Sequence, residues 1–259
     1  KRKAGNVTLW EAFQRAMWHF YRINDDDSEI ARKQLTELTS HSPAFAGGHA
    51  ALAILQLRRI LSGDPGDMRN VLASAQQHAT KAVELDDGSS MARIALSRVY
   101  QIQGKYDQAV REAETAISLN PNSSIGYLNL AGTLFWGGRS EDAIDALDKS
   151  IRLSPKGPML PLKKFSKGMC YYFIDRYEEA ETLLKDSQTS PMIMPFADLI
   201  LSVVFVRQNR LDDAKASISE ARELRPKFSL SGMSTAWHTL APRYRDKLLH
   251  DLKVAGLPD

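Results

Sequence analysis

The chain has 259 residues, a formal net charge of +3 and a hydrophobic content of 43%, which is typical of a folded protein and argues against disorder. Its Lys and Arg residues are scattered rather than clustered, so the sequence does not predict a surface that follows nucleic-acid phosphates. The only cysteine, Cys170, excludes an intrachain disulfide and a cysteine-rich metal site.

The chain begins with a short basic stretch, KRKAG, with neither an initiator Met nor an apolar signal core, and we therefore expect a fragment of a longer protein. The most apolar stretch, residues 192–206, contains Pro195 and Asp198. It is also shorter than the roughly 20 apolar residues that cross a bilayer, so no membrane span is predicted here.

The first predicted helix pair covers approximately residues 8–43, with Ala31 and Leu35 on the apolar face of its second helix and Pro43 after it. An acidic cluster, residues 25–29, lies just before that second helix. It lacks the glycine and the alternating ligands of a calcium loop. We therefore predict that Asp27 or Ser28 caps the helix.

The second predicted pair, approximately 44–89, has a first helix at 44–61 and a second helix that contains Ala75, Ala79 and Ala82. Between them, residues 62–67 read Ser-Gly-Asp-Pro-Gly-Asp, a turn-rich insertion. We interpret this insertion as a tolerated surface loop, with a functional edge of the solenoid as the alternative.

The third pair, approximately 90–123, shows the pattern most clearly. Gly104 separates two amphipathic helices at a position that requires a left-handed residue, and Pro121 ends the second helix. Further pairs are predicted at approximately 124–157, 158–194 and 195–228. Small residues and prolines repeat at intervals of 34: Ala75, Ala109 and Ala143; Pro121 and Pro155; Ala180 and Ala214.

A 34-residue period is similar to that of the tetratricopeptide repeat, a helix–turn–helix unit. The predicted fold is all-α: a right-handed tetratricopeptide superhelix, or α-solenoid, of antiparallel helix pairs that forms one domain over 1–259. The cap at 229–259 is predicted to contain helices at 230–240 and 241–254 and to cover the last apolar face.

In the family that the chain resembles, the first helices of the repeats line a concave groove that binds partners. The corresponding positions are mostly apolar and aromatic, which favours a protein or peptide partner. The predicted groove residues are Ile94, Arg98, Ile125, Leu128, Phe135, Trp136, Phe165, Met169, Tyr172, Phe173, Phe196, Leu199, Val203 and Arg207.

Two other readings of these residues remain open, because the capping segment or a second copy of the chain would also cover such a surface. One partner type is not expected. Chaperone adaptors of this family hold a C-terminal carboxylate with Lys, Arg and Asn, whereas the same positions here are Leu128, Gly132, Phe165 and Met169.

No phosphate-binding loop, nucleophile elbow or zinc-protease motif is present, and the six histidines show no ligand-like spacing. We therefore predict no cofactor, no metal site and no catalytic residues in this segment. The histidines are predicted to lie at the surface or between helices.

The ends of the chain carry a more specific resemblance. Residues 9–22, LWEAFQRAMWHFYR, and residues 252–259, LKVAGLPD, are similar to the ends of bacterial regulatory tetratricopeptide domains. Residues 153–158, LSPKGP, resemble a loop of those domains, although Gly157 replaces an acidic residue. Such domains follow class III adenylate or guanylate cyclases, or winged-helix transmembrane transcription regulators.

The resemblance implies a sensor or interaction module whose catalytic or DNA-binding head lies upstream, with a cyclase favoured. Any membrane attachment would also lie upstream, at either face of a bacterial inner membrane. The alternatives are a dimerisation scaffold, in which a homodimer buries the groove, and a small-molecule sensor. The segment itself is not expected to bind nucleic acid or to be an enzyme.

Overall fold

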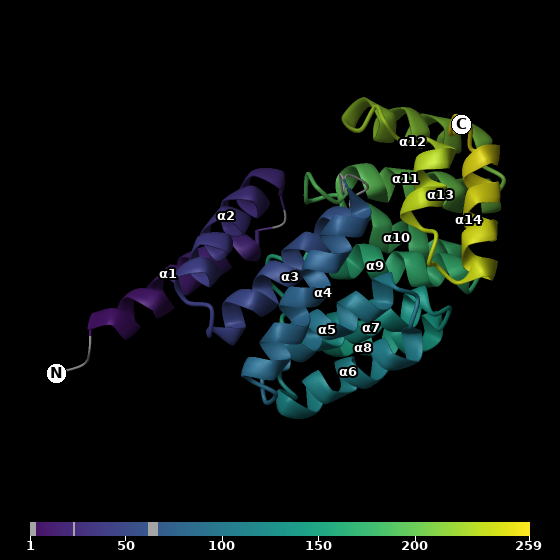
Figure 1. The fold of residues 1–259 in the computed structure, drawn as a ribbon. Helices are drawn as coiled ribbons and strands as arrows, with labels where there is room; N and C mark the ends of the chain where they lie inside the picture. Colours follow the sequence, from purple (N-terminus) through teal and green to yellow (C-terminus); the bar gives the residue numbers. More distant parts are fainter. Residues whose placement is uncertain (1–3, 23, 62–66) are drawn as a thin grey trace. The chain divides into compact units, whose positions relative to one another are not determined.

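The computed structural model describes residues 4–22, 24–61 and 67–259, and every regular element in these ranges is an α-helix (Figure 1). The all-α prediction is therefore confirmed. The helices are α1 Ala4–Phe20, α2 Asp25–His41, α3 Ala46–Leu61, α4 Met68–Leu85, α5 Ser90–Ile102, α6 Tyr106–Leu119, α7 Ser124–Trp136, α8 Ser140–Leu153, α9 Leu160–Phe173, α10 Tyr177–Ser187, α11 Met194–Arg207, α12 Leu211–Leu224, α13 Leu230–Ala236 and α14 Pro242–Val254.

The helices form two compact units, residues 1–129 and 130–259, with the boundary inside α7. Consecutive helices pair as the repeat period predicts: α1 with α2, α3 with α4, and α5 with α6 in unit 1, then α9 with α10 and α11 with α12 in unit 2. The two predicted helices of the cap are present as α13 and α14. The predicted insertion at 62–66 lies outside the described residues.

In four repeats, the turn between the two helices has the same backbone conformation. Gly104, Gly138, Asp175 and Asn209 each have a positive φ, between 60° and 83°. In each turn the following residue donates its N–H to a carbonyl five residues earlier, for example Lys105 to Tyr100 at 2.9 Å. This bond satisfies a carbonyl at the helix end, and the left-handed residue allows the chain to reverse.

The second helices contribute stripes of alanine that allow close helix packing. Ala75, Ala79 and Ala82 in α4 are fully buried, as are the equivalent alanines of α6. Gly168 in α9 serves the same purpose, because a Cβ there would lie 2.8 Å from Leu184 Cγ. The 34-residue spacing in the sequence therefore reflects the steric requirement for small residues where paired helices cross.

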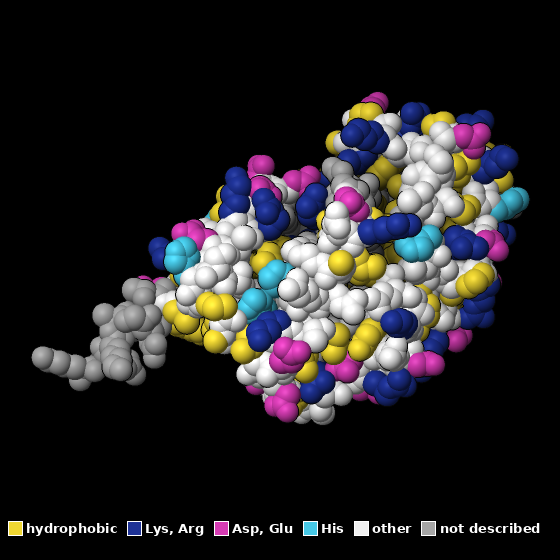
Figure 2. Space-filling view, viewed as in Figure 1, with side chains coloured by type: hydrophobic (Ala, Val, Ile, Leu, Met, Phe, Trp, Pro, Cys, Tyr) yellow, Lys and Arg dark blue, Asp and Glu magenta, His cyan; other side chains and the backbone are white. Residues whose placement is uncertain are grey.

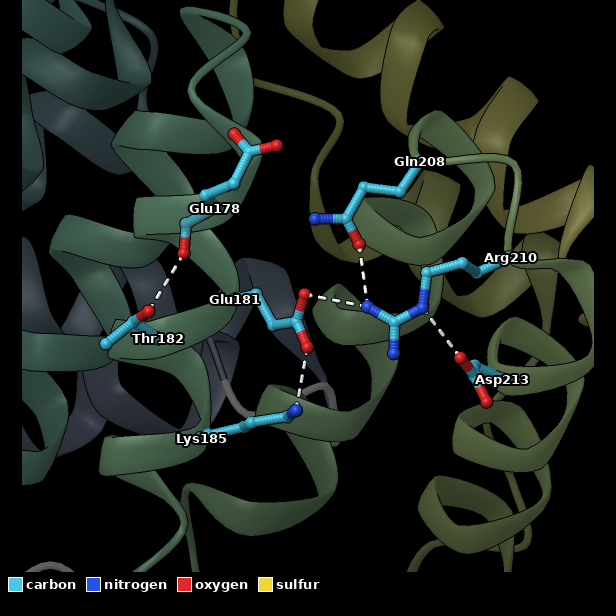
Figure 3. Close-up of polar contacts among 7 residues, drawn as sticks. All are labelled: Glu178, Glu181, Thr182, Lys185, Gln208, Arg210 and Asp213. Atoms are coloured by element: carbon cyan, nitrogen blue, oxygen red, sulfur yellow. Dashed lines mark hydrogen bonds and ion pairs between the residues drawn. The ribbon is translucent and has the colours of Figure 1, made fainter.

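Polar contacts join successive repeats at the surface of unit 2 (Figure 3). Glu181 in α10 accepts a hydrogen bond from Lys185 Nζ at 2.7 Å and another from Arg210 Nη1 at 2.9 Å. Arg210 Nε also donates to Asp213 Oδ2 at 2.7 Å. Arg210 thus ties the start of α12 to the preceding repeat through a carboxylate that it shares with a lysine.

The cap of α2 differs from the prediction. Asn24, and neither Asp27 nor Ser28, is the N-cap residue, and its side chain accepts from Asp27 N at 2.8 Å. The Asp27 carboxylate is engaged elsewhere, because it accepts from Asn24 Nδ2 at 2.6 Å and pairs with His19 of α1. The acidic cluster therefore forms the first turn of α2, directly after the N-cap residue Asn24. Within the cluster, Asp27 links α2 to α1 through His19.

Candidate functional site

The C-terminal ends of the first helices in unit 2 form an aromatic surface on which α14 packs. The Tyr244 ring of α14 stacks on Phe173 of α9, with 4.1 Å between centroids and 12° between planes. Phe135 of α7 lies 5.6 Å from Phe173 and 6.0 Å from Tyr244. These three rings are at least nine-tenths buried, so the capping helix covers them.

A buried carboxylate joins the same helix to α9 and α11. Asp251 is 1% exposed and accepts from Tyr172 Oη at 2.5 Å and from Arg207 Nε at 2.6 Å. Burial, together with the Asp251 charge, raises the pKa of the Tyr172 phenol, so Tyr172 stays a hydrogen-bond donor. The buried carboxylate therefore accepts one hydrogen bond from a neutral donor, Tyr172, and one from a cationic donor, Arg207.

Basic side chains of α14 meet the carbonyl ends of the helices it covers. Lys247 Nζ donates to Tyr172 O at 3.0 Å and to Asp175 Oδ1 at 2.6 Å. Arg243 Nη2 donates to Gly138 O. Cations are favourable at helix C-termini, where unpaired carbonyls and the helix dipole present negative charge. The surface is therefore complementary to an amphipathic helix with an aromatic residue and basic residues.

The remaining predicted groove residues of unit 2 lie deeper or nearer the starts of the first helices. Leu199 and Val203 of α11 are fully buried. Met169 is buried and Phe165 is half-buried, both in α9, while Phe196 is half-buried with its ring 5.3 Å from Phe228. Trp136 is half-buried too, and its carbonyl accepts from Ala241 N at 2.9 Å.

The predicted groove residues of unit 1 divide in the same way. Ile94 of α5 and Leu128 of α7 are buried, and Ile125 is half-buried against the core of this unit. Arg58 of α3 and Arg98 of α5 are half-buried, and partial loss of contact with water lowers the pKa of both guanidinium groups. The predicted groove residues of unit 1 are thus three aliphatic side chains and Arg98, whereas those of unit 2 include several aromatic rings and Arg207.

Sequence analysis missed the residues that occupy the aromatic surface, above all Tyr244 and Asp251. Both lie in α14, outside the 34-residue pattern, and their partners are 44 to 109 residues away in the sequence. The sequence signal available for them was the pattern of a polar terminal helix with one apolar face. That pattern predicts an amphipathic helix, but it does not indicate which surface the helix packs on.

Unit 1 also contains a pocket of about 700 Å³ whose wall includes His49, His78, Lys81 and Glu84. His49 Nε2 lies 3.0 Å from Pro43 O, and its Nδ1 lies 2.8 Å from His78 Nδ1. Burial and the neighbouring His49 lower the pKa of His78. The two imidazoles can therefore share one proton, and they lie between helices, as predicted for histidines here.

Within the described ranges, no group of three or more His, Cys, Asp or Glu side chains could hold a metal ion. No helix among the described residues is long and apolar enough to cross a membrane. On the face shown in Figure 2, Lys and Arg are interspersed with Asp and Glu over both units. This distribution matches the scattered charges of the sequence.

The family comparison supports the repeat assignment. Residues 94–158 match the family described as "Tetratricopeptide repeat". This match covers about a quarter of the chain and includes α6, α7 and α8. Among curated proteins, the transcriptional regulator HilA of Salmonella typhimurium is 29% identical over 125 residues, which is 48% of this chain and 22% of HilA. The chain therefore spans only about a fifth of this relative.

Solved structures of tetratricopeptide proteins share the fold beyond that segment. A chain of the APC/C hetero-tetramer Cut9–Hcn1 superposes with a TM-score of 0.66 at 13% identity, covering 91% of this chain and 46% of that one. Pseudomonas aeruginosa pilF gives a TM-score of 0.55 at 17% identity, covering 87% and 95%. At these identities the likeness establishes the fold alone.

Proposed function

We propose that this segment is a protein- or peptide-binding regulatory module whose binding surface is built from the first helices of its repeats. The observation that supports it best is the docking of α14 on α7, α9 and α11. A surface that holds one amphipathic helix through a stacked aromatic ring and a buried carboxylate has the chemistry to hold another. In this proposal α14 is the resident occupant.

In this proposal, the predicted groove residues of unit 2 bind α14 when no partner is present and bind the partner helix when it displaces α14. Phe135, Phe173 and Tyr172 contact the occupying helix, and Arg207 pairs with its carboxylate. A partner helix gains access when it competes with α14 for these contacts. Because α14 belongs to the same chain, its effective concentration at the surface is high. A partner must therefore bind strongly enough to displace this tethered helix.

The test uses the full chain and its own helix as a probe. The double variant Tyr244→Ala/Asp251→Asn removes the two main contacts of α14, and Asp246→Asn is the matched control at an exposed position of the same helix. A fluorescein-labelled peptide of residues 241–257 is titrated against each protein. A peptide carrying the same two substitutions controls for nonspecific binding.

We expect the peptide to bind the double variant with a micromolar Kd and to bind the wild type and Asp246→Asn at least tenfold more weakly, since their surface is occupied. The substituted peptide should bind none of them. A folded double variant that fails to bind the peptide would contradict the proposal.

The longer protein is proposed to be a bacterial regulator. The resemblance of the chain ends favours a cyclase or a transcription regulator, and the partial similarity to HilA favours the second of these. Binding at the helical surface would bias the head domain only if the partner prefers one of its two states. Binding measurements on the full-length protein, with and without the nucleotide or DNA ligand of its head, test this coupling.

Dimerisation through the same surface is a second candidate, and the exchange of α14 between two copies is the specific route. The docked helix follows the short α13 and makes its contacts through side chains that a second copy can supply equally. Light scattering during size-exclusion chromatography distinguishes the two cases. A stable dimer that becomes monomeric in the Tyr244→Ala/Asp251→Asn variant supports exchange.

A further inference from the structure

Three successive first helices end in unit 2, and their ends differ in the charge that they present. Gly138, in the turn after α7, has no side chain, so this end offers backbone carbonyl oxygens. The equivalent turn after α9 adds the carboxylate of Asp175. Arg207 is the last residue of α11 and brings a cation to the third end. Because unpaired carbonyls at a helix C-terminus carry partial negative charge, the order along the surface is negative, negative, positive.

Three charged residues of α14 meet these ends in the complementary order. Each makes a polar contact with one end: Arg243 Nη2 with Gly138 O, Lys247 Nζ with Asp175 Oδ1 at 2.6 Å, and Asp251 Oδ2 with Arg207 Nε at 2.6 Å. Residues four positions apart lie on the same side of a helix, one turn after another. Consecutive turns of α14 therefore contact successive repeats with the charges basic, basic, acidic.

The buried apolar positions of α14 follow the same interval. Tyr244, Leu248 and Leu252 each come directly after one of the charged residues, and all three are buried. The two residues between successive pairs are less buried, and Asp246 and His250 among them are exposed. The contact face of α14 therefore consists of three pairs in the sequence, RY, KL and DL, each separated from the next by two residues.

This order of charges determines the direction in which a helix can lie on the surface. In a helix of the opposite direction, the acidic residue would face the carbonyl oxygens after α7, and a basic residue would face Arg207. Asp251 is 1% exposed, so a charge at its position is little screened by solvent. Like charges that meet in such a contact are repulsive, and interfaces use this repulsion to reject wrong partners.

We propose that the partner of this surface is an amphipathic helix of the same direction as α14, with a basic–aromatic pair, a basic–leucine pair and an acidic–leucine pair at four-residue intervals. This inference rests on the proposed peptide-binding function and specifies the chemistry of the partner. A helix with this pattern replaces α14 contact for contact. An amphipathic helix with the same residues in another order of charge does not.

The first experiment compares three fluorescein-labelled peptides of residues 241–257 on the full-chain Tyr244→Ala/Asp251→Asn variant. One peptide has the native sequence. The contact-exchange peptide, Arg243→Asp/Asp251→Arg, exchanges charges that meet the helix ends. The exposed-exchange peptide, Asp246→Lys/Lys253→Asp, exchanges two exposed charges. All three have the same composition and net charge. The contact exchange places an acid near the helix N-terminus and a base near its C-terminus, so it does not weaken the helix itself.

We expect the exposed-exchange peptide to bind within about threefold of the native peptide, and the contact-exchange peptide to bind about tenfold more weakly or worse. A contact-exchange peptide that binds as tightly as the exposed-exchange peptide would overturn the ordered-charge partner. The proposed function would survive that result, because the native peptide would still bind. Failure of the native peptide to bind would overturn both.

The second experiment reverses one charge pair within the intact chain. Urea unfolding is measured for the wild type, Arg207→Glu, Asp251→Lys and Arg207→Glu/Asp251→Lys. The double variant should unfold at a higher urea concentration than either single variant, because opposite charges again meet at the end of α11. The control Arg207→Glu/Asp246→Lys changes an exposed acid of the same helix and should show no such rescue. A double variant that is less stable than both single variants would overturn the requirement for opposite charges at this end.

Discussion

Tyr244 stacks face to face on Phe173, with their centroids 4.1 Å apart, and thereby fastens the last helix to a repeat about 70 residues earlier in the chain. Tyr244 is also near Phe135, so one side chain of α14 contacts two successive first helices. The capping helix thus runs across repeats of unit 2 in addition to ending the repeat array. The stability of its docking is the first quantity to measure.

The Tyr244→Ala variant should unfold more readily by about 3–5 kcal/mol, because it leaves a cavity beside Phe135 and Phe173. Tyr244→Phe keeps the stacked ring and loses only a 3.4 Å contact from Ser140 N, so its cost should be below about 1 kcal/mol. Urea unfolding followed by circular dichroism measures both. Similar destabilisation of the two variants would show that the hydroxyl, and not the ring, holds the helix.

Asp251→Asn should cost about 2 kcal/mol, since the Arg207 hydrogen bond loses its charge-assisted acceptor. Tyr172→Phe removes the other donor, and the double variant should cost less than the sum of the single changes because both donors share one carboxylate. Urea midpoints for the four proteins of this cycle give the coupling energy. Asp246→Asn, at an exposed position, should be close to neutral.

Asp198 predicts an unusual dependence of stability on pH. Burial is the main cause that raises its pKa, to about 6, and Glu220 adds to it, although a hydrogen bond from Gln188 opposes the shift. The folded state therefore binds a proton more tightly than the unfolded state. The stabilisation that protonated Asp198 contributes to the folded state is fully present below the unfolded pKa. It is lost as pH rises through the folded pKa of about 6.

Asp198→Asn removes this titration and should be more stable than the wild type at pH 7.5 by up to about 3 kcal/mol. The advantage should shrink as pH falls, to below about 1 kcal/mol at pH 4, which lies just above the unfolded pKa of 3.8. Urea midpoints of the two proteins across pH 4–8 test the sign. A wild type that gains stability relative to the variant as pH rises would contradict it.

Cys170 should be unreactive in the native protein. It is fully buried in α9, and burial is the main cause that raises the pKa of its thiol to about 12. Thiolate, the reactive form, is therefore scarce and shielded from reagents. Ellman's reagent should detect one thiol only after denaturation in guanidinium. Rapid stoichiometric reaction in native buffer would show that this part of α9 opens readily.

The predictable part of this structure is the part that repeats. Ala75, Ala109 and Ala143 recur because each repeat needs a small residue at the same helix crossing, and Gly104 and Gly138 recur because each turn needs a left-handed residue. These are local requirements that every repeat meets with its own residues. They allowed the helix pairs, the turns and the candidate groove positions to be placed from the sequence.

The periodicity could not reveal what covers those positions. The prediction that Phe135, Tyr172, Phe173 and Arg207 line a partner-binding groove stays a prediction; their neighbour in the structure is α14.

The sequence by itself determined the helix pairs and the aromatic or cationic character of each first helix, since a fixed period and local sterics are written along the chain. Only the tertiary structure decided that Tyr244 and Asp251 of α14 meet the aromatic surface. Such contacts occur once, between distant segments, and depend on shape and charge complementarity that no repeat encodes.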